Sequence, residues 1–433
     1  MAAEAIPPRI PVASGDLATA MLRGMANLVL GCRLTFDEHL DADVLSRATR
    51  LILDIEPVLG CWFDEGFLSA EWVRCSDLDG AEYFSVVETD DPDRDAAAFH
   101  GNRFEPRGPR LAVRLLRSAD HDDMCVRMDH LVGDGWSTKK VAYMLAETYS
   151  KLLADTTCDP APNLTPRPSG PDLWDALTPE QQKAAEAGNV IPEIPKWRLG
   201  PFHPGSGAGL RIQRMTLGPD EFTAMKSYGK ARSATVNDMV LTGMLRALAS
   251  VWPPAPNATP IISVTSNLRL LVDQPRFDRV CGLSGVVSVS IDHNDGDDFD
   301  GTLRRTIEGV RPHRDSLWGA KSLNSSPGRW YRLLGAVMAV LTRATLGNGK
   351  FAPMLVNIGV IDDAQLGFGA ATPVSAHICG SMPLGAGFGA TVSTYRDNLT
   401  VWMGNFEEHI APEMVEGVLA RMGEELRTTT IAG

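Results

Sequence analysis

Alternating apolar and polar runs along the chain predict a mixture of helices and strands. Apolar residues recur at helical spacing over 45–59, which predicts an amphipathic helix there. The short apolar runs 111–116 and 124–128 predict two neighbouring strands, joined by a turn over 118–123. Residues 1–155 are therefore predicted to form an N-terminal half in which helices and strands alternate.

A change in composition separates this region from the rest of the chain. Residues 156–209 contain clustered prolines and close on three spaced glycines, which predicts a crossover linker with a short helix over 179–187. Residues 210–433 form the predicted C-terminal half, and 433 residues are enough for two domains. The predicted elements of this half are a helix over 236–248, strands over 261–265 and 286–291, and a hairpin over 391–402.

The longest apolar stretch, 333–341, is too short to span a bilayer, and Arg343 follows it closely. This stretch could form a core helix or a surface that meets a greasy substrate, and the core helix is the favoured prediction. No signal peptide is visible in residues 1–12. We therefore expect no membrane span.

Composition and charge exclude some classes of partner. Hydrophobic residues make up 44% of the chain and charged residues 22%, as in an ordinary globular protein. The net charge of −13 argues against nucleic acid or an anionic membrane as the main partner, although a small basic patch for a phosphate-bearing donor is compatible with it. The seven cysteines are scattered without a CxxC pair, which predicts free thiols in a cytoplasmic protein and offers no zinc or other metal site.

The segment 129–135, with the sequence Asp-His-Leu-Val-Gly-Asp-Gly, is the most informative part of the chain. It follows the predicted strand 124–128, so His130 lies where a strand becomes a turn, a common place for catalytic side chains. An imidazole titrates near neutrality and can accept a proton from a hydroxyl or an amine. The alternative is a buried histidine satisfied by the backbone, since so short a pattern recurs by chance.

The residues after His130 predict a tight turn and a helix. Gly133 and Gly135 mark the turn, because glycine adopts backbone angles that other residues resist. Ser137 or Thr138 can cap the helix that follows. Asp134 could contact His130 directly, or it could turn away and brace the loop through an arginine.

Segment 130–137 resembles the HHxxxDG motif of nonribosomal peptide condensation domains and their relatives, which include chloramphenicol acetyltransferase, plant BAHD acyltransferases, wax ester synthases and polyketide-associated acyltransferases. The catalytic second histidine of that motif corresponds to His130, and Asp129 replaces the first. A carboxylate at Asp129 cannot donate a hydrogen bond when ionised. Other segments resemble the family in the same order along the chain, namely 41–60, 235–241, 266–269, 357–359 and 392–395.

The resemblance implies an α/β fold of two chloramphenicol acetyltransferase-like sandwich halves that form a V around a central tunnel. His130 would lie in the middle of the tunnel, with the acyl donor entering from one face and the acceptor from the other. The family also suggests a monomer. In this family an alcohol or amine loses its proton to the histidine and attacks a thioester carbonyl.

The resemblance assigns roles to particular residues. His130, Asp134 and Gly135 form the predicted catalytic group, with the Gly135 N–H as a candidate oxyanion donor. Asp134 is predicted to pair with Arg269 and to shape the loop, and Asp129 is a second supporting residue. The tunnel or oxyanion candidates are Trp136, Asn357, Ser393 and Thr394.

The leading functional prediction is a free-standing acyltransferase that forms an ester or an amide, in bacterial specialised metabolism. It would bind no resident cofactor, and its thioester co-substrate would be coenzyme A or a phosphopantetheinyl carrier protein. A catalytically inactive recruiting module is one alternative, favoured only by Asp129. Cyclisation or epimerisation in the same tunnel is another, because relatives with those activities keep the histidine.

Overall fold

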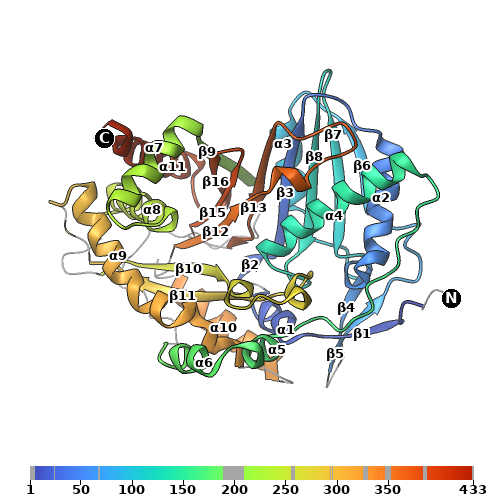
Figure 1. The fold of residues 1–433 in the computed structure, drawn as a ribbon, viewed down its shortest axis with the longest axis horizontal. Coiled ribbons are helices and arrows are strands. Elements are labelled where there is room, and N and C mark those ends of the chain that lie inside the picture. Colours follow the sequence, from blue (N-terminus) through green and yellow to red (C-terminus); the bar gives the residue numbers. More distant parts are fainter. Residues whose placement is uncertain are drawn as a thin grey trace.

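The computed structural model describes residues 5–23, 25–66, 69–188, 209–254, 259–292, 294, 296–324, 330–346, 353–383 and 388–431. In this part of the chain two α/β halves lie side by side (Figure 1). The predicted mixed α/β class is confirmed. None of the helices in the described ranges combines the length and the apolarity that crossing a membrane requires.

The first half is built on a five-stranded sheet with helices on both faces. Its strand order is β13 (Ser375–Cys379), β3 (Val29–Phe36), β8 (Asp122–Asp129), β7 (Leu111–Arg117) and β6 (Phe84–Glu88). Alternation along β8 sorts its side chains, so that Met124, Val126 and Met128 face a core shared with α2 (Ala42–Ile55) and α4 (Gly135–Ala154). Cys125 faces the opposite core, which α3 (Pro92–Gly101) covers.

Smaller elements complete this half. A three-stranded sheet has the order β1 (Arg9–Pro11), β5 (Ala70–Arg74) and β4 (Cys61–Glu65), and α1 (Ser14–Ala20) follows β1. The helix predicted over 45–59 ends at Ile55, and a 3-10 turn, Pro57–Gly60, continues from it. The proline explains this break, because it favours the first turn of a new helix and disfavours an α conformation in the residue before it.

The second half has a six-stranded sheet backed by helices. The strand order is β11 (Ser284–Ser290), β10 (Ile261–Asn267), β12 (Met354–Val360), β15 (Gly389–Tyr395), β16 (Asn398–Phe406) and β9 (Leu210–Leu217). Its core joins this sheet to α7 (Pro219–Ala231), α8 (Val236–Val251), α9 (Phe299–Asp315) and α11 (Pro412–Ile431). The predicted hairpin is confirmed, and its turn residues Arg396 and Asp397 both have positive φ, 45° and 57°, as a two-residue hairpin turn requires.

The second half contributes two strands to the first half. β13 comes late in the chain, yet it pairs antiparallel with β3 of the first half, with Ile378 opposite Cys32. A two-residue strand, β14 (Met382–Pro383), pairs with β2 (Ala26–Asn27) in the same way. The C-terminal region thus adds strands to the first half, which no pattern in the sequence indicated.

The helical part of the linker packs on the second half. Two short helices, α5 (Gly170–Ala176) and α6 (Pro179–Glu186), share a core with the 3-10 segment Leu317–Asn324. The predicted helix over 179–187 is therefore confirmed, while residues 189–208 of the linker lie outside the described ranges.

The prediction of a core helix over 333–341 is wrong. A helix forms there, α10 (Tyr331–Leu346). Among the residues of this helix whose exposure the structure describes, only Tyr331 and Gly335 are buried. Large apolar residues elsewhere on the helix, among them Leu333 and Val340, are 59% and 66% exposed. An apolar run predicts a helix, but it does not say how many sides of that helix are covered.

Candidate active site

His130 lies directly after β8, in a turn that fixes its ring. Its backbone N–H donates to the carbonyl oxygen of Leu28 (2.8 Å). The ring Nδ1 lies 2.9 Å from the carbonyl oxygen of Gly133. A carbonyl oxygen only accepts, so Nδ1 carries the proton in this arrangement. Nε2 of the half-buried imidazole keeps its lone pair and is the nitrogen that can act as a base.

The Asp134 carboxylate is buried and accepts five hydrogen bonds, three from the second half and two from Ser137 of α4. Oδ2 accepts from Arg269 Nη1 (2.6 Å), from the Leu283 N–H (2.8 Å) and from Ser284 Oγ (3.1 Å). Oδ1 accepts from the N–H and Oγ of Ser137 (3.1 and 3.0 Å). Of the two predicted arrangements, the brace through an arginine is confirmed, and that arginine is Arg269.

The electrostatics of this pair favour the charged forms. Burial raises the pKa of Asp134, but the Arg269 guanidinium and the N–H donors outweigh it, so the pKa of this carboxyl lies below its usual value. The Arg269 guanidinium has further acceptors in the carbonyl oxygens of Phe277 and Cys281. The ion pair is therefore closed off from solvent and fully hydrogen-bonded on its carboxylate side.

The start of α4 differs from the prediction in its cap. Asp134, and not Ser137 or Thr138, is the N-cap residue, and Ser137 completes the cap by bonding back to Asp134. A carboxylate at this position can satisfy helix N–H groups as well as the arginine. The N–H groups of Ser137 and Thr138 are taken by Asp134. The Gly135 N–H belongs to the first turn of the helix, where no intrahelical acceptor is available.

The two glycines of the motif are needed for space and not for unusual backbone angles. Neither Gly133 nor Gly135 has a positive φ, so the conformational reason given by the sequence analysis is wrong. A Cβ on Gly133 would lie 2.7 Å from Cβ and Oγ of Ser137. A Cβ on Gly135 would collide with Cδ1 of Ile358 in β12. Gly135 thus lets the second half approach the motif closely.

The other predicted residues lie around this junction with their polar atoms engaged in the fold. The Arg269 guanidinium lies over the half-buried Trp136 ring, 4.8 Å from its centroid. Asn357 Oδ1 accepts from the Gly359 N–H (2.9 Å) at a bulge in β12. Ser393 Oγ accepts from the Ile378 N–H (3.1 Å) and so joins the two halves. Thr394 is buried in β15, and its carbonyl oxygen accepts from the Ile361 N–H (2.8 Å).

Two buried cations near the motif were not found from the sequence. Arg167, in the proline-rich linker, donates to Val132 O (2.6 Å) within the motif and pairs with Asp16 (2.7 Å). Lys139 in α4 donates to the carbonyl oxygens of Ile358 (2.9 Å) and Val360 (3.0 Å) across the junction. Burial lowers the pKa of Lys139 to about 8. Neither the proline-rich composition around Arg167 nor the helical spacing around Lys139 gave a signal for these contacts.

The histidines other than His130 lie in polar or turn-like stretches of the sequence, which predicts surface positions for most of them. His100, His377 and His409 are nevertheless buried. His100 and His377 line a small cavity of about 40 Å³ between the halves. β13 carries His377 into the sheet of the first half, where it lines the same cavity as His100 of α3. His203 and His293 lie outside the described residues.

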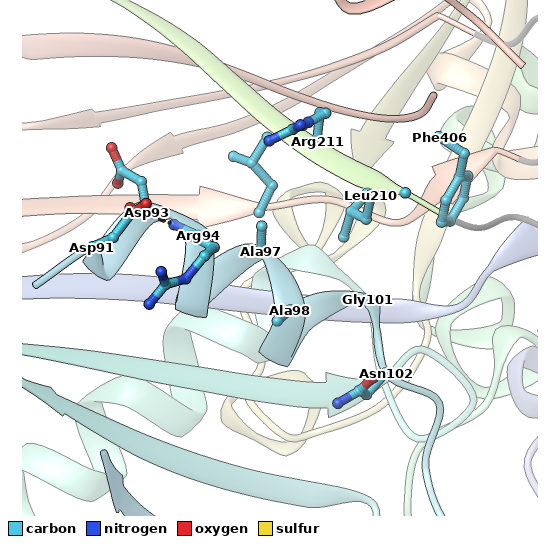
Figure 2. A pocket seen from close by; sticks show the side chains of 12 residues that line it. Asp91, Asp93, Arg94, Ala97, Ala98, Gly101, Asn102, Leu210, Arg211 and Phe406 are labelled. Atoms are coloured by element: carbon cyan, nitrogen blue, oxygen red, sulfur yellow. Dashed lines mark hydrogen bonds between the residues drawn. The ribbon is translucent and has the colours of Figure 1, made fainter. Parts of the chain in front are cut away.

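A larger cleft of about 560 Å³ separates α3 of the first half from β9 and β16 of the second (Figure 2). Apolar side chains from both halves line it, including Ala97, Leu210 and Phe406. One end reaches Gly101, whose carbonyl oxygen accepts from Asn27 Nδ2 (3.0 Å). Leu28 follows Asn27 and its carbonyl oxygen accepts from the His130 N–H, so two consecutive residues connect this end of the cleft with the motif.

Comparisons with known proteins agree on the fold. No protein-family profile and no curated protein sequence matches the chain. Among solved structures, the first condensation domain of the CDA synthetase is similar, with 15% identity, a TM-score of 0.70, and 97% of this chain and 95% of that one covered.

Two further structures are similar over nearly their whole length. The TRI3 trichothecene 15-O-acetyltransferase from Fusarium sporotrichioides has 13% identity and a TM-score of 0.71, with 98% of this chain and 95% of that one covered. The epimerization domain from the third module of tyrocidine synthetase B has 14% identity and a TM-score of 0.63, with 99% and 97% covered. The chain therefore has the two-halved α/β fold of condensation domains and related acyltransferases, as its sequence resemblance predicted.

Proposed function

We propose that this chain is a condensation-type acyltransferase that moves an acyl or aminoacyl group from a thioester to an alcohol or an amine. The observation that carries the proposal is the hydrogen bond from His130 Nδ1 to Gly133 O, which leaves Nε2 as a base at the junction of the halves. The fold shared with condensation domains and an acetyltransferase supports the same class of reaction.

In the proposed reaction, Nε2 of His130 accepts the proton of the acceptor hydroxyl or amine. The freed electron pair attacks the thioester carbonyl carbon, and a tetrahedral oxyanion forms. Collapse of that intermediate breaks the carbon–sulfur bond, and the imidazolium returns its proton to the departing thiolate. A positioned base contributes roughly 10²–10⁴-fold to such a rate.

The first turn of α4 is the proposed stabiliser of the oxyanion. The Gly135 N–H lies at the positive end of a 20-residue helix. Asp134 acts in this scheme by holding the turn, because all its hydrogen bonds go to Arg269, Ser137, Leu283 and Ser284. The cleft between α3 and β9, which has both charged and apolar lining residues, is the proposed place for part of a substrate.

The donor is proposed to be coenzyme A or an acylated carrier protein, and the setting a bacterial natural-product pathway. Condensation domains of nonribosomal synthetases, to which the chain is similar in fold, support a carrier-bound donor. Epimerisation is a second candidate, because an epimerization domain shares the fold.

The test is a pooled reaction with acyl-coenzyme A thioesters, acylated carrier proteins, and mixed alcohols and amines. Mass spectrometry would identify an ester or amide, and a thiol reagent would measure released thiol. The variants are His130→Ala and, as a matched control, His39→Ala, whose exposed ring lies 3.1 Å from the Ser118 carbonyl oxygen. We expect product from the wild type and the control alone.

Each other outcome has a defined meaning. Equal product from His130→Ala would contradict the role of His130 as the base. Inversion of a chiral centre without release of thiol would replace acyl transfer by epimerisation. Absence of any product across the pool would favour the inactive recruiting module.

A further inference from the structure

Asp129 binds the backbone N–H groups of the two residues that follow His130. It is the last residue of β8 and is 6% exposed. Its Oδ1 accepts from the Leu131 N–H (3.0 Å), and its backbone carbonyl oxygen accepts from the Val132 N–H (3.1 Å). Both N–H groups that follow His130 are therefore bound to this one residue, which fixes the course of the turn toward Gly133.

Arg110 holds the other oxygen of the same carboxylate. Its Nη1 lies 3.3 Å from Asp129 Oδ2, and the two side chains are 7% and 8% exposed. Arg110 Nη2 donates to three carbonyl oxygens of its own loop, at residues 105, 106 and 108. These contacts fix the position of the guanidinium independently of Asp129. The guanidinium is then the partner that a buried carboxylate needs.

The chemistry of a carboxylate suits this place, and that of an imidazole does not. Each Asp129 oxygen faces a donor, Leu131 N–H on one side and Arg110 on the other. A carboxylate accepts with both oxygens, whereas a neutral imidazole has a single acceptor nitrogen and an imidazolium has none. Residues 110 and 129 therefore depend on each other.

We infer that Asp129, held by Arg110, is a positioning residue that sets the tautomer of His130 through the 129–133 turn. The bond from His130 Nδ1 to Gly133 O exists only while that turn keeps its course. Releasing Leu131 would let the turn relax and let the ring exchange its proton between Nδ1 and Nε2. The consequence for catalysis rests on the proposed function, but the tautomer itself does not.

Asp129→Asn is the sharpest test, because the amide nearly matches the carboxylate in shape. In one orientation its NH₂ group faces Arg110, and in the other it faces the Leu131 N–H, so one of the two hydrogen bonds is lost in either case. The matched control is Asp123→Asn at the other end of β8. Asp123 is also buried and pairs with an arginine, Arg33, but it is remote from the turn.

The measurement is nuclear magnetic resonance of protein carrying ¹⁵N in its histidine rings, without substrate. Signals that disappear in His130→Gln assign the ring. We expect the proton on Nδ1 of His130 in the wild type and in Asp123→Asn, and a mixture of tautomers in Asp129→Asn. An unchanged Nδ1 tautomer in folded Asp129→Asn would overturn the inference. Should that variant not fold, Arg110→Lys keeps the charge and is expected to give the same shift to a smaller extent, with an unchanged tautomer again contradicting us.

Kinetics separate positioning from plain stability. If acyl transfer is found, Asp129→Asn should lower kcat roughly 10- to 100-fold with little change in KM, because a misplaced base affects the chemical step. Asp123→Asn should leave kcat of the folded protein unchanged. A normal kcat alongside a shifted tautomer would remove Asp129 from the mechanism. Failure of acyl transfer itself would leave the tautomer result standing, so the two failures are distinguishable.

Discussion

Replacing Asp134 by asparagine tests whether the carboxylate braces the two halves around the motif. Three donors meet Oδ2, namely Arg269, the Leu283 N–H and Ser284, and two donors of Ser137 meet Oδ1. An asparagine must turn its NH₂ group toward one of these two sets. It cannot accept there, so donors that were satisfied would face another donor in a buried site.

The expected loss of stability is large, although the substitution replaces only one oxygen by an NH₂ group. Removing one partner from a buried, hydrogen-bonded ion pair costs about 3–5 kcal/mol. A typical domain has only about 5–15 kcal/mol of stability in total. Because the folded state lowers the pKa of Asp134, the contribution of this group is full above the pKa of the unfolded carboxyl and is lost as the pH falls through the folded one. The difference between wild type and variant should therefore shrink in acid.

The assay is urea unfolding at neutral pH, followed by tryptophan fluorescence and circular dichroism. Asp120→Asn is the control, since that carboxylate is exposed and its ion pair is with His121 at the surface. We expect Asp134→Asn to unfold at clearly lower urea and to lose acyl transfer, while the control matches the wild type. A loss below about 1 kcal/mol with activity retained would refute the bracing role, because a buried charge pair cannot be broken so cheaply.

Two further predictions concern space and pH. Gly135→Ala should lower activity by pressing on Cδ1 of Ile358, and adding Ile358→Val should restore it by removing that atom. Gly133→Ala meets the fixed Cβ of Ser137, so adding Ile358→Val should not restore its activity. Equal behaviour of the two double variants would contradict this explanation. Burial lowers the pKa of His100 and of His377 to about 3, so only the unfolded chain gains these protons as the pH falls below about 6.5. The urea concentration at the unfolding midpoint should therefore decrease when the pH is lowered from 7.5 to 5.5. A variant with glutamine at both positions should lack this decrease.

The elements that the sequence predicted well are those set by neighbouring residues. The strand 124–128 follows from a short apolar run. The hairpin around 396–398 follows from a turn that local backbone geometry decides. Asp134 and Arg269 are 135 residues apart, and only the resemblance to condensation domains connected them. Periodicity indicates which face of an element is apolar, but it does not identify what that face meets. The exposed face of α10 is the clearest example.

The site shows why a motif locates a candidate base more readily than it explains the geometry of that base. The turn around His130 is held by Asp129 from within the motif, but Arg110 fixes Asp129, Arg167 binds Val132 O, and Arg269 binds Asp134. These three arginines come from the first half, the linker and the second half. A change in how the halves meet would therefore reach the His130 ring through the turn. The segment 129–135 supplies the candidate base, and residues far from it in sequence determine the geometry of the turn that holds its ring.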